Sequence, residues 1–257
     1  MNTLLSALRR LLPVFLLLPG WGCGEINPTA PGSKPVGHEA WDALLKKHVS
    51  AEGSVRYQGF RADRVALQNY LNLLSQNAPN DQTWSRDEQL AYWINAYNAF
   101  TIDLILQHYP VKSITELGGS IPFVNTPWDI DFVPVGEKKY TLNDLEQRLI
   151  RKKFDEPRIH FALVCAAASC PRLRNEAYVA AQLNRQLDEQ TKEFINHPDK
   201  NKLTTNAAQL SKIFDWYEGD FTKHGSLVDF LNRYSTVKLR PEAKISHLDY
   251  AWALNGQ

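Results

Sequence analysis

Residues 88–106 form a long stretch with almost no charge, and its hydrophobic positions recur on nearly every face of a helix. At about 3.6 residues per turn, Glu88, Asn95 and Asn98 fall close to one face, while aromatic and aliphatic side chains occupy the others. A helix that is apolar nearly all round belongs in a core. The pattern therefore predicts a central buried helix, which ends before Pro110.

Shorter amphipathic or alternating stretches predict the remaining elements. Helices are expected at residues 38–49, 62–74, 141–153, 175–195 and 226–234. Extended segments are expected at residues 53–57, 131–140 (a hairpin), 158–165, 202–204, 210–217, 237–239 and 245–252. Because helices dominate the first half, we predict a single α+β domain in which N-terminal helices and the central helix pack on a mostly antiparallel sheet.

The N-terminus differs from the rest of the chain. Arg9 and Arg10 precede a short apolar run that ends in small residues and Cys23. This pattern predicts a secretory signal over residues 1–23, since the run is too short for a comfortable transmembrane helix. The ending resembles a bacterial lipoprotein signal, which leaves two alternatives: lipidation at Cys23, or simple cleavage nearby.

Two further segments complete the expected organisation. Residues 24–37 are rich in Pro, Gly, Ser and Thr, a composition that predicts a flexible tether. We expect residues 38–257 to form one globular domain. The expected location is the periplasm, or the outer membrane as a lipoprotein, with membrane contact only through a lipid anchor at Cys23.

Composition excludes several classes of function. The 257 residues include 29 Lys and Arg against 28 Asp and Glu, which gives no case for a nucleic-acid-binding surface. The seven histidines form no close ligand pair, and there is no glycine-rich phosphate loop. We therefore expect neither a metal site nor a cofactor, and the partner, an envelope substrate or protein, is not identified by the sequence.

Cys165 and Cys170 leave three alternatives open. In an oxidising compartment the pair is a candidate for a disulfide, and buried unreactive thiols are a second interpretation. The third is a catalytic site in which Cys165 is the nucleophile and His160 the base. The five-residue spacing argues against it, because on a regular strand the two side chains point to opposite faces.

The other candidate residues also have both a catalytic and a structural interpretation. Asn95 and Asn98 would orient the imidazole or polarise a carbonyl in an enzyme, or else form amide bonds within the core. Glu88 is a candidate acid, but Ser85 lies three residues before it, which is the spacing of a helix cap. Residues 215–220 combine three acids with two aromatic residues; such a motif suits a sugar or peptide groove, although a surface turn is its commoner meaning.

Several motifs resemble one known family, the domain-of-unknown-function family numbered 547. They occupy residues 92–99, 160–165, 170–171, 174–178, 210–217 and 248–255. The resemblance covers roughly residues 38–255 and implies an exported bacterial protein without an established activity. The order of helix and strand also resembles papain-like and transglutaminase-like cysteine hydrolases, but residues 84–107 contain no cysteine.

Two functional hypotheses follow. The first is a cell-envelope cysteine hydrolase or acyl transferase that acts on amide or ester bonds in a polar cleft formed by Asn95, Asn98, His160 and Cys165. The second is a non-catalytic envelope protein, either binding or structural, in which the same residues form the core.

Overall fold

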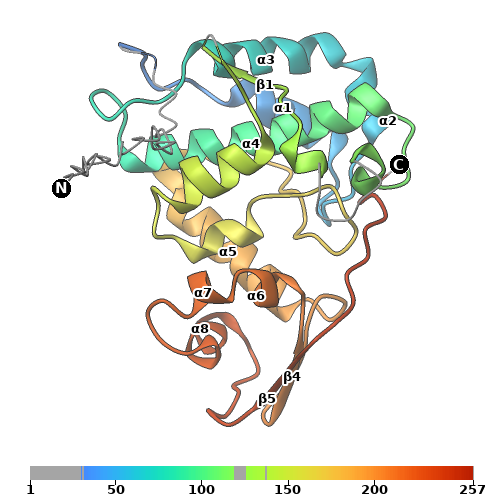
Figure 1. Cartoon of the computed structure of the whole chain (residues 1–257), viewed down its shortest axis with the longest axis vertical. Helices are drawn as coiled ribbons and strands as arrows, with labels where there is room; N and C mark the ends of the chain where they lie inside the picture. Colours follow the sequence, from blue (N-terminus) through green and yellow to red (C-terminus); the bar gives the residue numbers. More distant parts are fainter. Residues whose placement is uncertain (1–29, 31, 119–125, 137, 257) are drawn as a thin grey trace, which may run out of the picture.

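The helix α4 (Arg86–His108) runs through the middle of the molecule (Figure 1). Our description rests on a computed structural model and covers residues 30, 32–118, 126–136 and 138–256. Every residue from 89 to 106 is buried, as the apolar pattern predicted. A capping box begins the helix: the Ser85 hydroxyl accepts from the Glu88 amide, and the Glu88 carboxylate accepts from the Ser85 amide at 2.7 Å. Glu88 is thus the helix cap.

Helices pack around α4 on several sides. The neighbours are α2 (Tyr57–Ala62), α3 (Arg64–Gln76), the π-helix η3 (Asp144–Arg151) and the short 3-10 helix η5 (Ala180–Gln182). The helix α1 (Glu39–His48) packs on α2 and α3. Two further 3-10 turns, η1 (Ile114–Leu117) and η2 (Pro127–Asp129), follow α4. The predicted helix at 38–49 is confirmed, and its apolar stripe is buried against the same core.

The second half of the chain builds a smaller core of its own. Its elements are η4 (Pro157–Phe161), α5 (Leu183–Asn196), α6 (Ile213–Trp216), α7 (Glu218–Phe221) and α8 (Leu227–Tyr234). Five phenylalanines meet between them: Phe161, Phe194, Phe214, Phe221 and Phe230. The capping box predicted by Ser226 and Asp229 begins α8.

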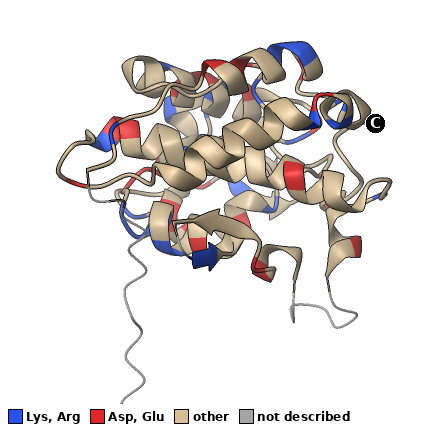
Figure 2. Ribbon diagram, turned by 90° about the horizontal axis from the view of Figure 1, so that it is seen from above, with Lys and Arg blue, Asp and Glu red and all other residues tan. Residues whose placement is uncertain are grey.

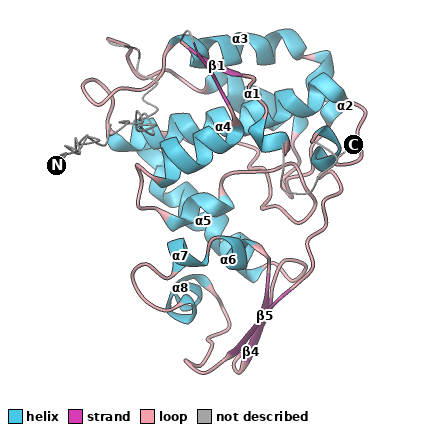
Figure 3. Ribbon diagram, in the orientation of Figure 1, coloured by secondary structure: helices cyan, strands magenta, loops and turns pink. Residues whose placement is uncertain are grey.

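Strands form two small sheets at opposite ends of the molecule (Figure 3). The predicted hairpin is β1 (Val133–Val135) paired antiparallel with β2 (Lys138–Tyr140). In the other sheet β4 (Ala207–Leu210) pairs antiparallel with β3 (Lys202–Thr204) and parallel with β5 (Lys244–His247). The α+β prediction is confirmed, with about 49% helix and 11% strand among the residues that the structure describes. Helices surround α4, whereas the strand β4 contributes to the smaller core. The three-stranded sheet therefore does not cover the central helix.

The prediction of a buried strand at residues 158–165 is wrong. Pro157 begins a 3-10 helix, and the Glu156 side chain accepts from the Arg158 amide as its cap. Beyond Phe161, the Ala162 carbonyl and the Val164 amide form hydrogen bonds with the Asn98 side chain of α4 and not with a neighbouring strand. An apolar run whose backbone groups are satisfied in this way needs no sheet.

Three other boundaries differ from the sequence prediction. The helix expected from residue 175 begins at Leu183, residues 213–216 are helical and not extended, and residues 237–239 form no strand. These segments are short, so tertiary contacts decide their conformation over weak local preferences.

The N-terminal predictions fall mostly on residues that the structure does not describe. The signal segment and Cys23 lie outside the described residues. Within the predicted tether, Ser33 is buried and its hydroxyl donates to the Ala78 carbonyl at 2.6 Å, so the chain is held from this point onward. No helix in the described part of the chain is long and apolar enough to cross a membrane. Lys, Arg, Asp and Glu are scattered over the ribbon in Figure 2.

Candidate functional site

The two asparagines of α4 hold neighbouring backbone segments. Asn98 donates to the Ala162 carbonyl and accepts from the Val164 amide, both at 2.9 Å. Asn95 forms the same two-point contact with Tyr178, donating to its carbonyl at 2.8 Å and accepting from its amide at 3.0 Å. Asn95 is 0% exposed and Asn98 3% exposed. Both amides therefore act as core clamps, and no solvent reaches them to form a wet site.

His160 is directed into a different polar cluster. Its side chain is buried, stacks on Tyr217 with ring centroids 3.9 Å apart, and places Nε2 2.7 Å from Oδ2 of Asp220. Arg151 donates to both oxygens of the same carboxylate, at 2.7 and 2.8 Å. The hydrogen bond from His160, followed by those from Arg151, holds the pKa of Asp220 well below its usual range against the opposing effect of burial. His160 is thus a hydrogen-bonded core histidine in this structure.

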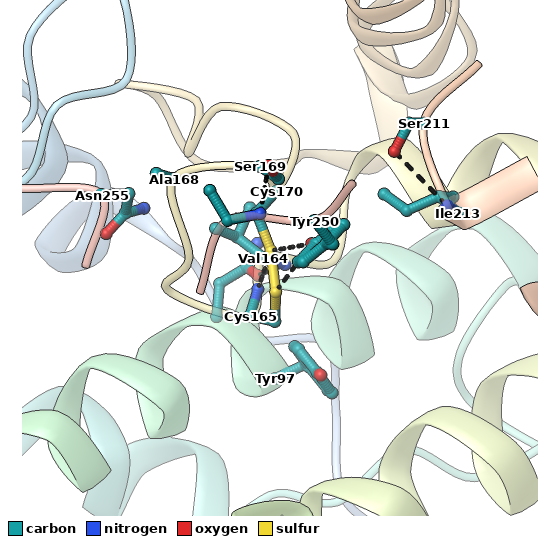
Figure 4. The surroundings of a disulfide bond; sticks show 12 residues. Tyr97, Val164, Cys165, Ala168, Ser169, Cys170, Ser211, Ile213, Tyr250 and Asn255 are labelled. Atoms are coloured by element: carbon teal, nitrogen blue, oxygen red, sulfur yellow. Dashed lines mark hydrogen bonds between the residues drawn. A yellow bond between two sulfur atoms is a disulfide. The ribbon is translucent and has the colours of Figure 1, made fainter. Parts of the chain in front are cut away.

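Cys165 and Cys170 form a disulfide, with an S–S distance of 1.98 Å. The Cys165 amide donates to the Cys170 sulfur at 2.9 Å, and the Tyr250 hydroxyl lies 3.3 Å from each sulfur (Figure 4). A bonded sulfur is not a thiolate and cannot act as the predicted nucleophile. Of the three alternatives for the cysteines, the structure has the disulfide.

The structure does not bring the four residues of the predicted catalytic cleft together around one space. The cleft required Asn95, Asn98, His160 and Cys165 around one solvent-accessible space. The prediction assumed a strand through residues 160–165, whereas the 3-10 helix and following turn direct His160 toward Asp220 and Cys165 toward Cys170.

Glu146 is a buried acid that the sequence analysis missed. Tyr217 donates to one carboxylate oxygen at 2.5 Å, and Tyr97 lies 3.4 Å from the other. Burial, reinforced by the nearby carboxylate, raises the pKa of both phenols, so that each remains a donor. Two tyrosines and the Gln147 side chain thus provide the hydrogen-bond partners of the buried carboxyl group. No local motif around Glu146 predicts the two tyrosines, which come from α4 and from residue 217.

Four aromatic side chains at the surface form a group that we call the aromatic ladder: Trp128, Trp216, Tyr250 and Trp252. Trp128 and Trp252 have ring centroids 5.7 Å apart, and Trp252 stacks on Trp216 at 5.8 Å. Tyr250 lies 4.6 Å from Trp252 and 4.8 Å from Trp216. Trp216 is 48% exposed, and the other three are half-buried. Trp216 belongs to the motif at 215–220, and Tyr250 and Trp252 belong to the family motif at 248–255. No signal in the sequence predicts that these residues and Trp128 meet.

The C-terminal segment carries two members of the ladder and is fixed to the disulfide loop. The Ala168 amide donates to the Ala253 carbonyl at 2.6 Å, and the Ser169 amide to the Ala251 carbonyl at 3.1 Å. The Asn255 amide donates back to the Ala166 carbonyl at 3.0 Å. The disulfide loop therefore serves as the base on which this end of the ladder is held.

Among the described residues, no group of three or more His, Cys, Asp or Glu side chains is arranged to hold a metal ion. The fold and these contacts define a mainly helical α+β protein in which backbone groups satisfy the two asparagines of α4, and which carries an aromatic group at the surface.

Residues 82–195 match the model of the family described as "Protein of unknown function, DUF547". This match supports the family that the motifs predicted. The matched segment contains both asparagine clamps and the disulfide loop, whereas Trp128 is its sole contribution to the ladder. No curated protein and no solved structure matches the chain, so the likeness to papain-like and transglutaminase-like enzymes stays a prediction.

Proposed function

We propose that this chain is an exported cell-envelope protein that acts by binding a partner and not by cysteine catalysis. One observation carries the proposal: the residues that would build the enzyme already have structural roles. The asparagines clamp backbone, Glu88 caps α4, His160 bonds Asp220, and Cys165 is half of a disulfide.

Two features support the envelope location. The first is the basic and apolar N-terminal sequence, which is typical of a secretory signal. The second is the disulfide between Cys165 and Cys170, because disulfides form and persist mainly in oxidising compartments.

The aromatic ladder is the surface that we assign to binding. Large aromatic side chains are usually withdrawn from water, and exposed apolar patches often mark interaction sites. Trp216 is the one tryptophan among the described residues whose exposure exceeds a third of its surface.

Cell fractionation combined with thiol labelling tests the location and the state of the cysteines. The full chain, expressed with its own N-terminus in a Gram-negative host, is expected in the envelope fractions. A maleimide-linked polymer should leave Cys165 and Cys170 unlabelled until a reductant is added. The Cys23→Ser variant separates the two N-terminal alternatives, because it releases the protein from the membrane fraction if Cys23 is lipidated.

An activity assay tests the absence of cysteine catalysis. The wild type and the Cys165→Ser variant are compared on a panel of acyl esters and peptidoglycan-derived amides. We expect equal rates, at the level of the uncatalysed reaction. Turnover that disappears with Cys165→Ser, together with a rapidly labelled thiol in the native protein, would refute the proposal.

A further inference from the structure

We propose that the disulfide between Cys165 and Cys170 is a reducible switch for the aromatic ladder. A dithiol protein of the envelope reduces it by attack on the Cys165 sulfur, and the opened loop then loosens the C-terminal end of the ladder. This inference rests on the proposed binding function, because it names the regulation of the surface to which that binding is assigned.

The loop that the disulfide closes favours a reactive bond over a purely stabilising one. The two cysteines are five residues apart. Since the entropy that a cross-link removes from the unfolded chain grows with the length of the loop, so short a loop gains little from being closed. Ala166, inside the loop, has a φ of +62°, in the left-handed region that favours glycine. Opening of the bond therefore allows a strained backbone to relax, and disulfides in strained or exposed settings are the labile ones.

The two cysteines differ in how far solvent reaches them. Cys170 is 3% exposed, whereas Cys165 is half-buried. Between them in the chain, Ala168 is exposed, so the loop lies at the surface where another protein can approach it. An external thiolate reaches Cys165 more readily, which makes Cys165 the point of attack and the Cys170 sulfur the leaving group.

The leaving sulfur already has hydrogen-bond donors in place. The Cys165 amide lies 2.9 Å from the Cys170 sulfur, and the Tyr250 hydroxyl lies 3.3 Å from it (Figure 4). Burial raises the pKa of the Tyr250 phenol, so the phenol keeps its proton and donates. The negative charge that develops on Cys170 as the bond breaks therefore meets two donors without any rearrangement of the protein.

The exchange balances in atoms and electrons. One thiolate of the partner forms a bond to the Cys165 sulfur while the S–S bond breaks, and the electron pair of that bond leaves on the Cys170 sulfur. The partner's second thiolate then attacks the partner's own sulfur in the mixed disulfide and releases the Cys165 thiolate. The partner departs as a disulfide, and Cys165 and Cys170 gain its two electrons and the two protons of its thiols.

Reduction changes the support of the ladder. Two sulfurs that are no longer bonded must move apart to a contact distance of about 3.5 Å or more. Tyr250 lies against both sulfurs, and its ring centroid is 4.6 Å from that of Trp252 and 4.8 Å from that of Trp216. A closely packed region passes such a displacement on to its neighbours. Because the loop also forms hydrogen bonds with residues 251–255, its relaxation loosens the segment that carries Trp252.

The rate of reduction by dithiothreitol, with the purified full chain in native buffer and in denaturing urea, tests the switch. A maleimide-linked polymer stops the reaction, and each chain that has been reduced gains two labels. We expect the native rate to lie within a hundredfold of the rate in urea. A disulfide that is reached only by global unfolding would be reduced at least about a thousandfold more slowly in native buffer. A native rate more than a hundredfold below the rate in urea would overturn the inference.

A conservative variant tests the role assigned to the phenol. Tyr250→Phe keeps the ring and removes the donor, so it should slow native reduction at least threefold and leave the rate in urea unchanged. Tyr234→Phe is the matched control, because Tyr234 is also half-buried but packs on Phe230 in the smaller core; both of its rates should equal those of the wild type. Thermal unfolding confirms that each variant is folded. Equal native rates for Tyr250→Phe and the wild type would contradict the leaving-group role.

Mass spectrometry locates the point of attack. After brief treatment with reduced glutathione and quenching in acid, we expect the mixed disulfide on Cys165. Its appearance on Cys170 would overturn the inferred direction of the exchange.

Hydrogen exchange of the oxidised and the reduced wild type tests the effect on the ladder. The Ala251 amide, bonded to the Ser169 hydroxyl, and the Asn255 amide, bonded to the Ala166 carbonyl, should exchange at least tenfold faster after reduction. Equal exchange in the two states would show that the bond does not switch the ladder. Slow native reduction would leave the proposed binding function intact, whereas cysteine-dependent turnover of an acyl substrate would remove that function without changing the reduction rates.

Discussion

The clamps of α4 and the aromatic ladder use their side chains in opposite ways. Asn95 and Asn98 are polar groups in a dry core, and each has both hydrogen-bonding ends satisfied by backbone. The ladder places large apolar rings at the surface, where water contacts them. The difference teaches that unusual polar residues in a buried helix can be fully explained by folding, whereas the exposed part of Trp216 has no comparable structural explanation.

The sharpest test of this contrast is removal of a clamp. Asn98→Ala leaves the Val164 amide and the Ala162 carbonyl without their partners in the core. Each unsatisfied group costs about 1–3 kcal/mol, so the loss of both partners should lower the free energy of unfolding by about 2–6 kcal/mol. Chemical denaturation measures the change.

Asn72→Ala is the matched control, since Asn72 is an exposed amide on α3 that bonds only Gln68. It should change the free energy of unfolding by less than about 0.5 kcal/mol. A loss below about 1 kcal/mol for Asn98→Ala would mean that the core tolerates the unpaired groups and that the clamp is not a folding device.

The second test extends the comparison to titration. Burial lowers the pKa of His38 from 6.5 to about 4, and its Nδ1 lies 2.8 Å from the Tyr70 hydroxyl. Between these two pH values the unfolded chain takes up a proton at His38 and the folded protein does not, so stability falls as the pH falls. The difference of 2.5 pKa units corresponds to a loss of up to about 3 kcal/mol at pH 4.

Denaturation curves from pH 7 to pH 4 measure this loss. In His38→Gln, the free energy of unfolding should fall less between pH 7 and pH 4 than in the wild type, by up to about 3 kcal/mol. Equal slopes for wild type and His38→Gln would show that His38 does not titrate differently in the folded protein.

The third test addresses the boundary between the core and the ladder. The double variant Cys165→Ser with Cys170→Ser removes a bond that closes a six-residue loop, and the loop-closure relation gives about 2 kcal/mol for this length. Because Tyr250 contacts both sulfurs, we also expect weaker hydrogen-exchange protection of the Leu254 and Asn255 amides. Amides within α4 should keep their protection, and unchanged exchange at Asn255 would show that the C-terminal segment is held without the disulfide.

The sequence predicted much of the fold because local signals were strong. The apolar pattern and the capping box defined α4, Ser226 and Asp229 marked the start of α8, and the hairpin at 131–140 was correct. The candidate site was predicted less well. Which backbone Asn98 would clamp, and which carboxylate His160 would meet, depend on segments more than 50 residues away in the chain.

The sequence by itself determined the buried central helix, its two ends, the family and the pair of cysteines close enough to bond. Only the tertiary structure decided that residues 157–161 form a 3-10 helix and that backbone groups satisfy Asn95 and Asn98 inside the core. It also decided that four aromatic side chains meet at the surface: Trp128, Trp216, Tyr250 and Trp252. The physical reason is range: helix periodicity and caps act over a few residues, whereas hydrogen-bond partners and ring contacts depend on how distant segments pack.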